Sequence, residues 1–203
     1  MTQRSKIGLA IVLLVAAGAA TAFWLLLQHG FSARDQPTAI EAFVARRLRH
    51  LAVPRSARQA KNPIPATPEV LAEARAHFAD HCASCHGNDG SGQTEMGQRL
   101  YPKAPDMRQA DTQLLSDGEL FYIIHNGIRL TGMPAWGDSP PEEDQDSWKL
   151  VHFIRHLPEI SPEELEEMKK LNPKSPQEME EEEEEQKFLQ GEDSPSPSPQ
   201  HHH

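Results

Sequence analysis

The chain has 203 residues, which is room for one domain of ordinary size with extensions. Hydrophobic residues make up 37% of the sequence and there are 17 prolines, so part of the chain is expected to lie outside a packed core. The sequence has two cysteines, too few for a disulfide scaffold or a four-cysteine zinc site. The net charge of -10 divides into +7 over residues 1–62, -7 over residues 63–158 and -10 over residues 159–203, which indicates three regions with different neighbours.

An almost unbroken apolar run extends from Ile7 to Leu27. As a helix it would be roughly 31 Å long, enough to cross the hydrocarbon of a bilayer. Arg4 and Lys6 precede the run and favour a cytoplasmic start. Residues 1–28 are therefore predicted to be a short cytoplasmic segment and a transmembrane anchor.

A cleaved signal peptide is the alternative for this run. Ala20-Thr21-Ala22 has the small-x-small pattern of a cleavage site. Phe23 to Leu27 continue the apolar run beyond it, which an anchor requires and a signal peptide does not. The anchor is favoured, and under either interpretation the rest of the chain is exported.

Residues 29–64 are expected to hold a basic amphipathic helix and a proline-rich linker. The helix is predicted over residues 38–51, where apolar residues recur every three to four positions: Ile40, Phe43, Val44, Leu48 and Leu51. Such a helix suits a membrane surface or a partner protein, or it simply begins the exported region. Prolines at 54, 63, 65 and 68 mark residues 52–67 as a stiff linker.

Residues 65–158 are predicted to form the compact domain, and its pattern is helical. Thr67-Pro68-Glu69 begins a helix that leads to the cysteines, and Ser116-Asp117-Gly118-Glu119 is a capping box for a helix ending at Asn126-Gly127. A third helix is expected after Pro140-Pro141, reaching Leu157. No alternating strand pattern competes, so the predicted fold class is all-α, with one transmembrane helix ahead of the domain.

The end of the chain is acidic. Ser161-Pro162-Glu163-Glu164 predicts a short acidic helix within residues 159–173, stopped by Pro173. Residues 174–203 contain an unbroken Glu180–Glu185 run, Ser-Pro repeats and three terminal histidines, a composition typical of disorder. A docking tail for a basic partner is the alternative for this segment.

The run Cys82-Ala83-Ser84-Cys85-His86 carries the strongest chemical signal. It supplies two thiols to bond the vinyl groups of a haem and an imidazole to reach the iron from the same turn. A redox dithiol would need a βαβ setting that the sequence lacks. A zinc site using His152 and His156 would need spacings unlike those of zinc fingers. One covalently attached haem c is therefore expected.

A sixth iron ligand must come from elsewhere in the sequence. Met133 lies between Gly132 and Pro134 in a loop after the second helix, where its thioether is able to approach the iron opposite His86. Met96 and Met107 are rivals by composition, although Met96 is only ten residues from His86.

Residues 68–157 resemble a class I c-type cytochrome. The shared features are Phe78 four residues before the first cysteine, the CxxCH run, Met133-Pro134, and a last helix over 148–157. The Tyr101–Asp106 segment and the residues around Met133 are similar to the cytochrome c subunits of terminal oxidases. The resemblance implies His86 and Met133 as axial ligands, with the carbonyl of Pro105 or Pro102 accepting a hydrogen bond from His86.

One position departs from that family. Ala74 stands where the family commonly has a glycine at a helix crossing, and alanine is nearly as small. Other donors near the ligand loops, namely Tyr101, Arg108, Arg129 and Trp136, are candidates for the haem propionates, but each is equally suited to ordinary surface or core.

With both axial positions filled, one-electron exchange is the expected task, and the protein is expected to be an electron carrier and not an enzyme in its own right. Its partners would be redox proteins and, through the anchor, the bacterial inner membrane, with the haem domain on the periplasmic side; neither a nucleic acid nor a small-molecule substrate is expected. The alternatives are a subunit or scaffold of a larger oxidase or dehydrogenase, and an open-face haem enzyme or gas sensor.

Overall fold

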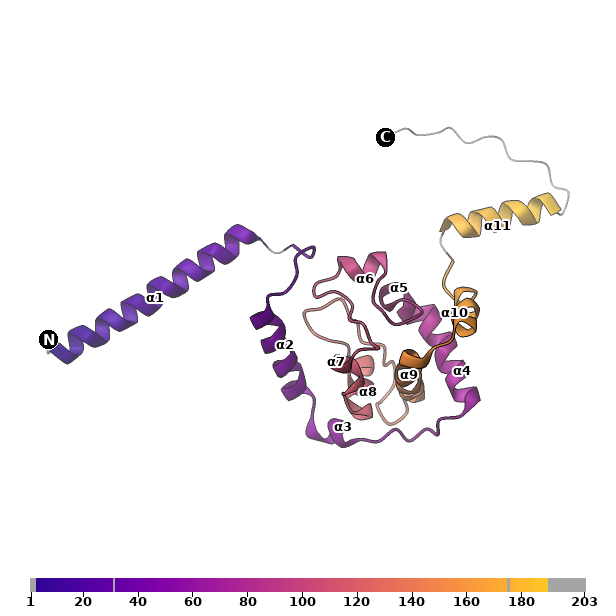
Figure 1. Ribbon diagram of the computed structural model, residues 1–203, viewed down its shortest axis with the longest axis horizontal. Coiled ribbons are helices and arrows are strands. Elements are labelled where there is room, and N and C mark those ends of the chain that lie inside the picture. Colours follow the sequence, from indigo (N-terminus) through magenta and orange to yellow (C-terminus); the bar gives the residue numbers. More distant parts are fainter. Residues whose placement is uncertain (1–2, 31, 175, 190–203) are drawn as a thin grey trace.

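The computed structural model describes residues 3–30, 32–174 and 176–189, and over these residues the chain is helical with no strand (Figure 1). The all-α prediction is confirmed. The elements are α1 (Gln3–His29), α2 (Ala39–Ala52), α3 (Arg55–Gln59), α4 (Pro68–His77), the π-helical turn η1 (Phe78–Cys82), α5 (Ala83–His86), α6 (Glu95–Arg99), α7 (Ala110–Gln113), α8 (Asp117–Asn126), α9 (Gln145–His156), the 3-10 turn η2 (Leu157–Glu159), α10 (Pro162–Lys169) and α11 (Pro176–Leu189).

Helix α1 extends away from the compact part of the molecule (Figure 1). Its most apolar 18-residue stretch has a mean hydropathy of 2.2, and none of that stretch is buried in the protein. By length and composition this helix is suited to crossing a membrane, because its apolar side chains have no protein surface to cover them.

Helices α2 and α3 lie along the edge of the compact domain (Figure 1). Thr38 caps α2 as its hydroxyl accepts a hydrogen bond from the Glu41 amide. The proline-rich segment after it was expected to be a plain linker, but it contains α3, which packs on α8. The Ser116 hydroxyl donates to the Arg58 carbonyl at 2.8 Å, so this segment is joined to the domain.

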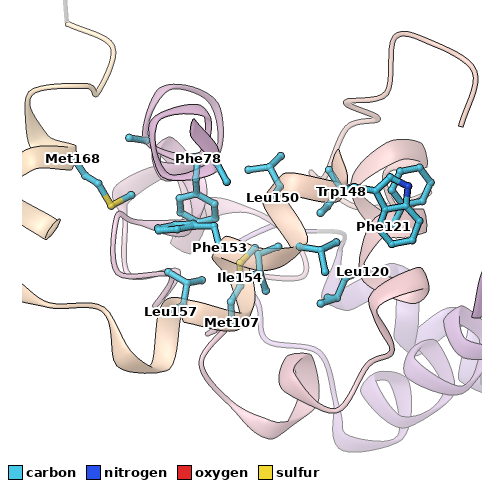
Figure 2. Packing of buried hydrophobic residues seen from close by; sticks show 14 residues of the cluster. Phe78, Met107, Leu120, Phe121, Trp148, Leu150, Phe153, Ile154, Leu157 and Met168 are labelled. Carbon is cyan, nitrogen blue, oxygen red and sulfur yellow. The ribbon is translucent and has the colours of Figure 1, made fainter. Parts of the chain in front are cut away.

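The core is built where α4 crosses α9 (Figure 2). Ala74 is 1% exposed at this crossing, in keeping with the small residue expected there. Phe78 and Phe153 pack with ring centroids 4.9 Å apart, and at the other end of α9 Phe121 stacks on Trp148 at 4.2 Å (Figure 2). Burying these large rings is the main source of stability for so small a domain.

The helix starts follow the capping signals closely. Thr67 caps α4, and Ser116 and Ser161 each make a complete capping box for α8 and α10. Two boundaries differ from the prediction. Helix α9 begins only at Gln145, because Asp144 accepts a hydrogen bond from the Ser147 amide and makes the cap. Helix α10 ends at Lys169, before Pro173.

A π-helical turn separates α4 from α5. In η1 the Ala83 amide donates to the carbonyl of Phe78, five residues back, in place of the usual four. This widened turn carries the first cysteine and leads directly into α5 with the second cysteine and the histidine. Such turns are rare and are found often at functional sites.

Part of the acidic tail, which was predicted to be disordered, is helical in the structure. Residues 176–189 form α11, whereas residues 190–203, also predicted to be disordered, lie outside the described residues. Glutamate has a good intrinsic helix propensity, and Lys187 pairs with Glu183 one turn back at 3.9 Å, which offsets part of the repulsion in the acidic run.

Candidate haem site

The CxxCH residues occupy the end of the helical run that crosses the core. Cys82 closes η1, while Cys85 and His86 lie on α5. His86 is 8% exposed, and both cysteines are half-buried. Gly87 ends the run with φ of 74°, a left-handed conformation that suits glycine.

The two thiols are free and not joined in a disulfide. Burial raises the pKa of Cys82 to about 12, and the neighbouring Cys85 adds to the shift. A reactive dithiol requires a lowered thiol pKa, so this environment does not suit redox exchange. Two neighbouring, unbonded thiols at the buried end of a helix fit attachment to a haem.

The His86 ring is buried, and no group lies at hydrogen-bonding distance and angle to its Nδ1. The Pro105 carbonyl is the backbone acceptor that acts on this ring, and it would hold Nδ1 and leave Nε2 for iron. Burial lowers the pKa of His86 to about 4, although the Pro105 carbonyl acts in the opposite direction. The imidazole is therefore neutral at physiological pH, the form that ligates metals.

The loop after His86 folds back against α5. The Gly92 amide donates to the His86 carbonyl at 2.7 Å, and a side chain at Gly92 would meet the Ala104 carbonyl at 2.4 Å. The Thr94 hydroxyl lies 2.8 Å from the Ser84 carbonyl and caps α6 by accepting from the Gly97 amide. These contacts close the open end of α5 with backbone and hydroxyl groups.

Gly97 allows the closest approach in this region. A Cβ at Gly97 would lie 2.1 Å from the carbonyl oxygen of Cys85, a clash with backbone that no side-chain movement relieves. Neither Thr94 nor Gly97 was singled out from the sequence. Thr94 followed by Glu95 is typical of a helix start, and this pattern could have identified Thr94 as a capping residue.

Met133 lies in a compact loop that returns to the end of α8. The Ile128 amide donates to the Met133 carbonyl at 3.1 Å, and the Met133 amide donates to the Thr131 hydroxyl at 3.1 Å. The Trp136 amide then donates to the Ile124 carbonyl at 3.1 Å. The backbone around Met133 is thus fixed on both sides, with its side chain half-buried.

Two contacts bring the Met133 loop to the cysteine segment. The rings of Trp136 and His81 meet edge to face with centroids 5.5 Å apart. On the other side, a Cβ at Gly132 would lie 2.6 Å from a methyl of Leu100, which follows α6. The loop therefore packs on elements that adjoin the Cys82 and Cys85 turns.

The rival methionines lie in less suitable places. Met96 is 55% exposed on α6, and Met107 is 9% exposed within the hydrophobic core. Neither combines the partial burial and the fixed loop backbone of Met133, so Met133 stays the ligand candidate.

The four candidates for contact with the haem propionates have other interactions or lie exposed at the surface. The Tyr101 hydroxyl donates to Glu41, and Arg108 pairs with Asp106 at 2.8 Å. Hydrogen bonds from Arg108 lower the pKa of Asp106 to about 2. Arg129 is exposed, and Trp136 packs against the core and His81.

The zinc alternative is not supported. His152 pairs with the Ile64 carbonyl at 2.8 Å, and His156 pairs with Glu164 at 2.9 Å. In the described part of the chain, no three His, Cys, Asp or Glu side chains gather as a metal site requires. The thiols, the buried neutral imidazole and the methionine loop instead fit a covalently held haem.

Residues 69–154 match the family described as cytochrome C oxidase, cbb3-type, subunit III. This segment is a c-type cytochrome domain. It begins with α4 and ends within α9, so the match covers both helices of the core crossing and the Met133 loop. The domain is related to the cytochrome c subunits of terminal oxidases, and the resemblance drawn from the sequence is confirmed.

Two relatives carry the same type of domain. The cbb3-type cytochrome c oxidase subunits FixP of Rhizobium meliloti (strain 1021) and of Sinorhizobium medicae (strain WSM419) are each 38% identical over 94 residues. The similar region is 46% of this chain and 29% of either relative. The chain thus matches less than a third of the length of these curated relatives.

Proposed function

We propose that this protein is a membrane-anchored c-type cytochrome that carries single electrons between redox proteins on the outer face of the bacterial cytoplasmic membrane. The observation that carries the proposal is the CxxCH turn at the buried end of the core helix, with the Met133 loop packed beside it. Helix α1 would supply the membrane span, because its long apolar stretch is not covered by the domain.

Each site residue has a separate role. Cys82 and Cys85 would hold one haem through thioether bonds, since they are the two cysteines of this sequence. His86 would bind the haem iron through its buried, neutral imidazole, and Met133 would bind it through its thioether. The bound haem c would supply reversible one-electron chemistry. The fixed backbone on either side of Met133 favours a constant ligand geometry.

A haem subunit within a larger oxidase is the second candidate. Its support is the similarity to cbb3-type oxidase subunits, which covers the cytochrome domain alone. The two functions share the same site and differ in whether the partner is permanent. Purification from native membranes in mild detergent separates them, because a subunit remains in a stoichiometric complex whereas a mobile carrier elutes alone.

The ligand assignment is tested by Met133→Ala, with Met96→Ala as the matched control. We expect Met133→Ala to remove the near-infrared methionine–iron band and lower the reduction potential, because a strongly potential-raising thioether is lost. Met96→Ala should leave both unchanged, since that side chain is exposed. An unchanged band in Met133→Ala, or carbon monoxide binding by the reduced unaltered protein, would contradict the six-coordinate assignment.

A further inference from the structure

Helix α2 is amphipathic, but its apolar side faces away from the protein. Five large apolar side chains on this helix are exposed by 46–78%: Ile40, Phe43, Val44, Leu48 and Leu51. They recur every three to four residues and so form one continuous row. The opposite side of the helix carries the half-buried Ala42 and Arg49 and leads into Val53, which is only 3% exposed.

Polar contacts hold α2 in this orientation on the cytochrome domain. His50 Nδ1 lies 2.8 Å from Glu119 Oε1, and Glu41 accepts from the Tyr101 hydroxyl. Arg46 lies 3.7 Å from Asp111. These contacts are spread along the helix and leave the apolar row directed away from the domain.

The position of α2 in the chain indicates what covers this row. Helix α1 ends at His29 and α2 begins at Ala39. The nine residues between them reach at most about 30 Å when extended, so α2 stays close to the surface of any membrane that α1 crosses. Figure 1 shows α2 at the edge of the domain on the side from which α1 extends.

The charges on α2 fit lipid headgroups. Arg46 and Arg47 are both exposed, and the Arg47 guanidinium lies 5.3 Å from the centre of the Phe43 ring. Basic side chains beside apolar ones are the pattern of helices that lie in the interface of an anionic bilayer. The cytochrome domain itself is acidic, so it has no comparable attraction to such a surface.

We propose that the apolar row of α2 inserts into the outer leaflet of the membrane and serves as a second lipid contact, which sets the distance and orientation of the cytochrome domain relative to the bilayer. The inference rests on the membrane anchor of the proposed function. It assigns to α2 a lipid surface rich in anionic headgroups, and not a protein partner.

The test places a nitroxide label on the full-length, haem-loaded protein in nanodiscs of phosphatidylethanolamine and phosphatidylglycerol. Thioether attachment occupies Cys82 and Cys85, so an introduced cysteine is the only free thiol. Val44→Cys and Leu51→Cys report on the row of α2. Leu114→Cys, at a position 84% exposed on the domain, is the matched control, and Ala17→Cys reports on α1.

Relaxation by oxygen, which concentrates in lipid, is compared with relaxation by a water-soluble nickel complex. We expect the oxygen-to-nickel accessibility ratio at positions 44 and 51 to exceed that at 114 several-fold, with an unchanged visible spectrum. A ratio like that of Leu114→Cys at both α2 positions overturns the inference. Protection from both reagents overturns it as well, because a protein then covers the row. Failure of the anchor itself is distinguishable, since Ala17→Cys would then also be open to nickel.

Discussion

At the scale of single residues, the buried pair of His125 and Asp144 connects the elements on the Met133 side of the domain. His125 Nδ1 lies 2.6 Å from Asp144 Oδ2, and the His125 ring stacks on Phe121 at 5.5 Å. A Cβ at Gly137 would lie 2.0 Å from that ring. The pair thus joins the end of α8, the exit of the Met133 loop and the start of α9.

Replacing Asp144 with asparagine tests the charge of this pair. Burial would raise the pKa of Asp144, but hydrogen bonds from His125 and Ser147 outweigh it and lower the pKa. Since asparagine still caps α9, Asp144→Asn should remove only the charged interaction and reduce the free energy of unfolding at pH 7 by about 2 kcal/mol. Urea unfolding of both proteins measures the difference.

The pH dependence of that difference has a definite sign. A carboxyl whose pKa is lower in the folded state contributes stability that is present above its ordinary pKa of about 3.9. The contribution is lost as the pH falls through the lower folded value. The two stabilities should therefore converge below about pH 4. A difference that stays constant into acid would show that the charge of Asp144 is not what stabilises the fold.

Gly97→Ala tests the close approach of α6 to the cysteine turn. The added methyl would lie 2.1 Å from the Cys85 carbonyl, so α6 must shift away from α5. We expect a loss of about 1–3 kcal/mol in the free energy of unfolding and a smaller haem-loaded fraction. Gly18→Ala, at a position with nothing within 4 Å, should change neither quantity in the compact domain.

The candidate attachment residues could be proposed from the sequence because they lie within five successive positions, 82–86, so that a local motif indicates their chemistry. The position of Met133 relative to His86 could not be predicted from local sequence, since Met133 lies 47 residues beyond His86 and its place depends on contacts between distant segments. The Trp136–His81 ring contact is one of these, and the Leu100 contact of Gly132 is another. Nothing in local spacing or propensity encodes such pairings.

At the scale of elements, the predictable part was the set of helix starts. Capping is local, because a hydroxyl or carboxylate accepts from an amide three residues on, as at Thr67, Ser116 and Ser161. The docking of α3 on α8 was missed for the opposite reason. Proline-rich sequence indicates a spacer, but here an alanine carbonyl of α3 meets a glycine of α8, a contact between residues far apart in the chain.

Gly118→Ala probes that docking. Its Cβ would lie 1.8 Å from the Ala57 carbonyl, so α3 would have to leave α8. We expect proteolysis to become faster within residues 55–59 and stability to fall by about 1–3 kcal/mol. Leu114→Ala, at an exposed site before α8, is the control and should leave the cleavage pattern unchanged. Equal resistance of the two variants would place the α3 contact outside the stable fold.

At the scale of the whole molecule, the compact unit extends beyond the 69–154 family match. Met168 on α10 is fully buried, and Arg75 of α4 pairs with Glu164 at 3.0 Å and with Glu167 at 2.7 Å. Helix α10 therefore covers the outer side of α4. By contrast, α11 carries mostly exposed acidic residues, and its helix reflects local propensity more than packing.

Two truncations separate these contributions. Ending the chain after residue 160 removes α10, and we expect the free energy of unfolding to fall by about 2–5 kcal/mol, as for loss of a large buried apolar side chain. Ending it after residue 173 removes only the acidic tail and should leave the melting temperature of the haem domain within error. Equal stability of the two truncated proteins would contradict the role of Met168 in the core.

The π-helical turn at Phe78–Cys82 has a consequence for chain length. A turn of this kind is equivalent to one residue inserted into an α-helix, so deleting one residue there would restore an unbroken helix. The deletion would also rotate α5 about the helix axis relative to Ala74 and Phe78, which are fixed in the core. The number of residues between the core helix and α5 thus sets the direction in which the Cys85 and His86 side chains point.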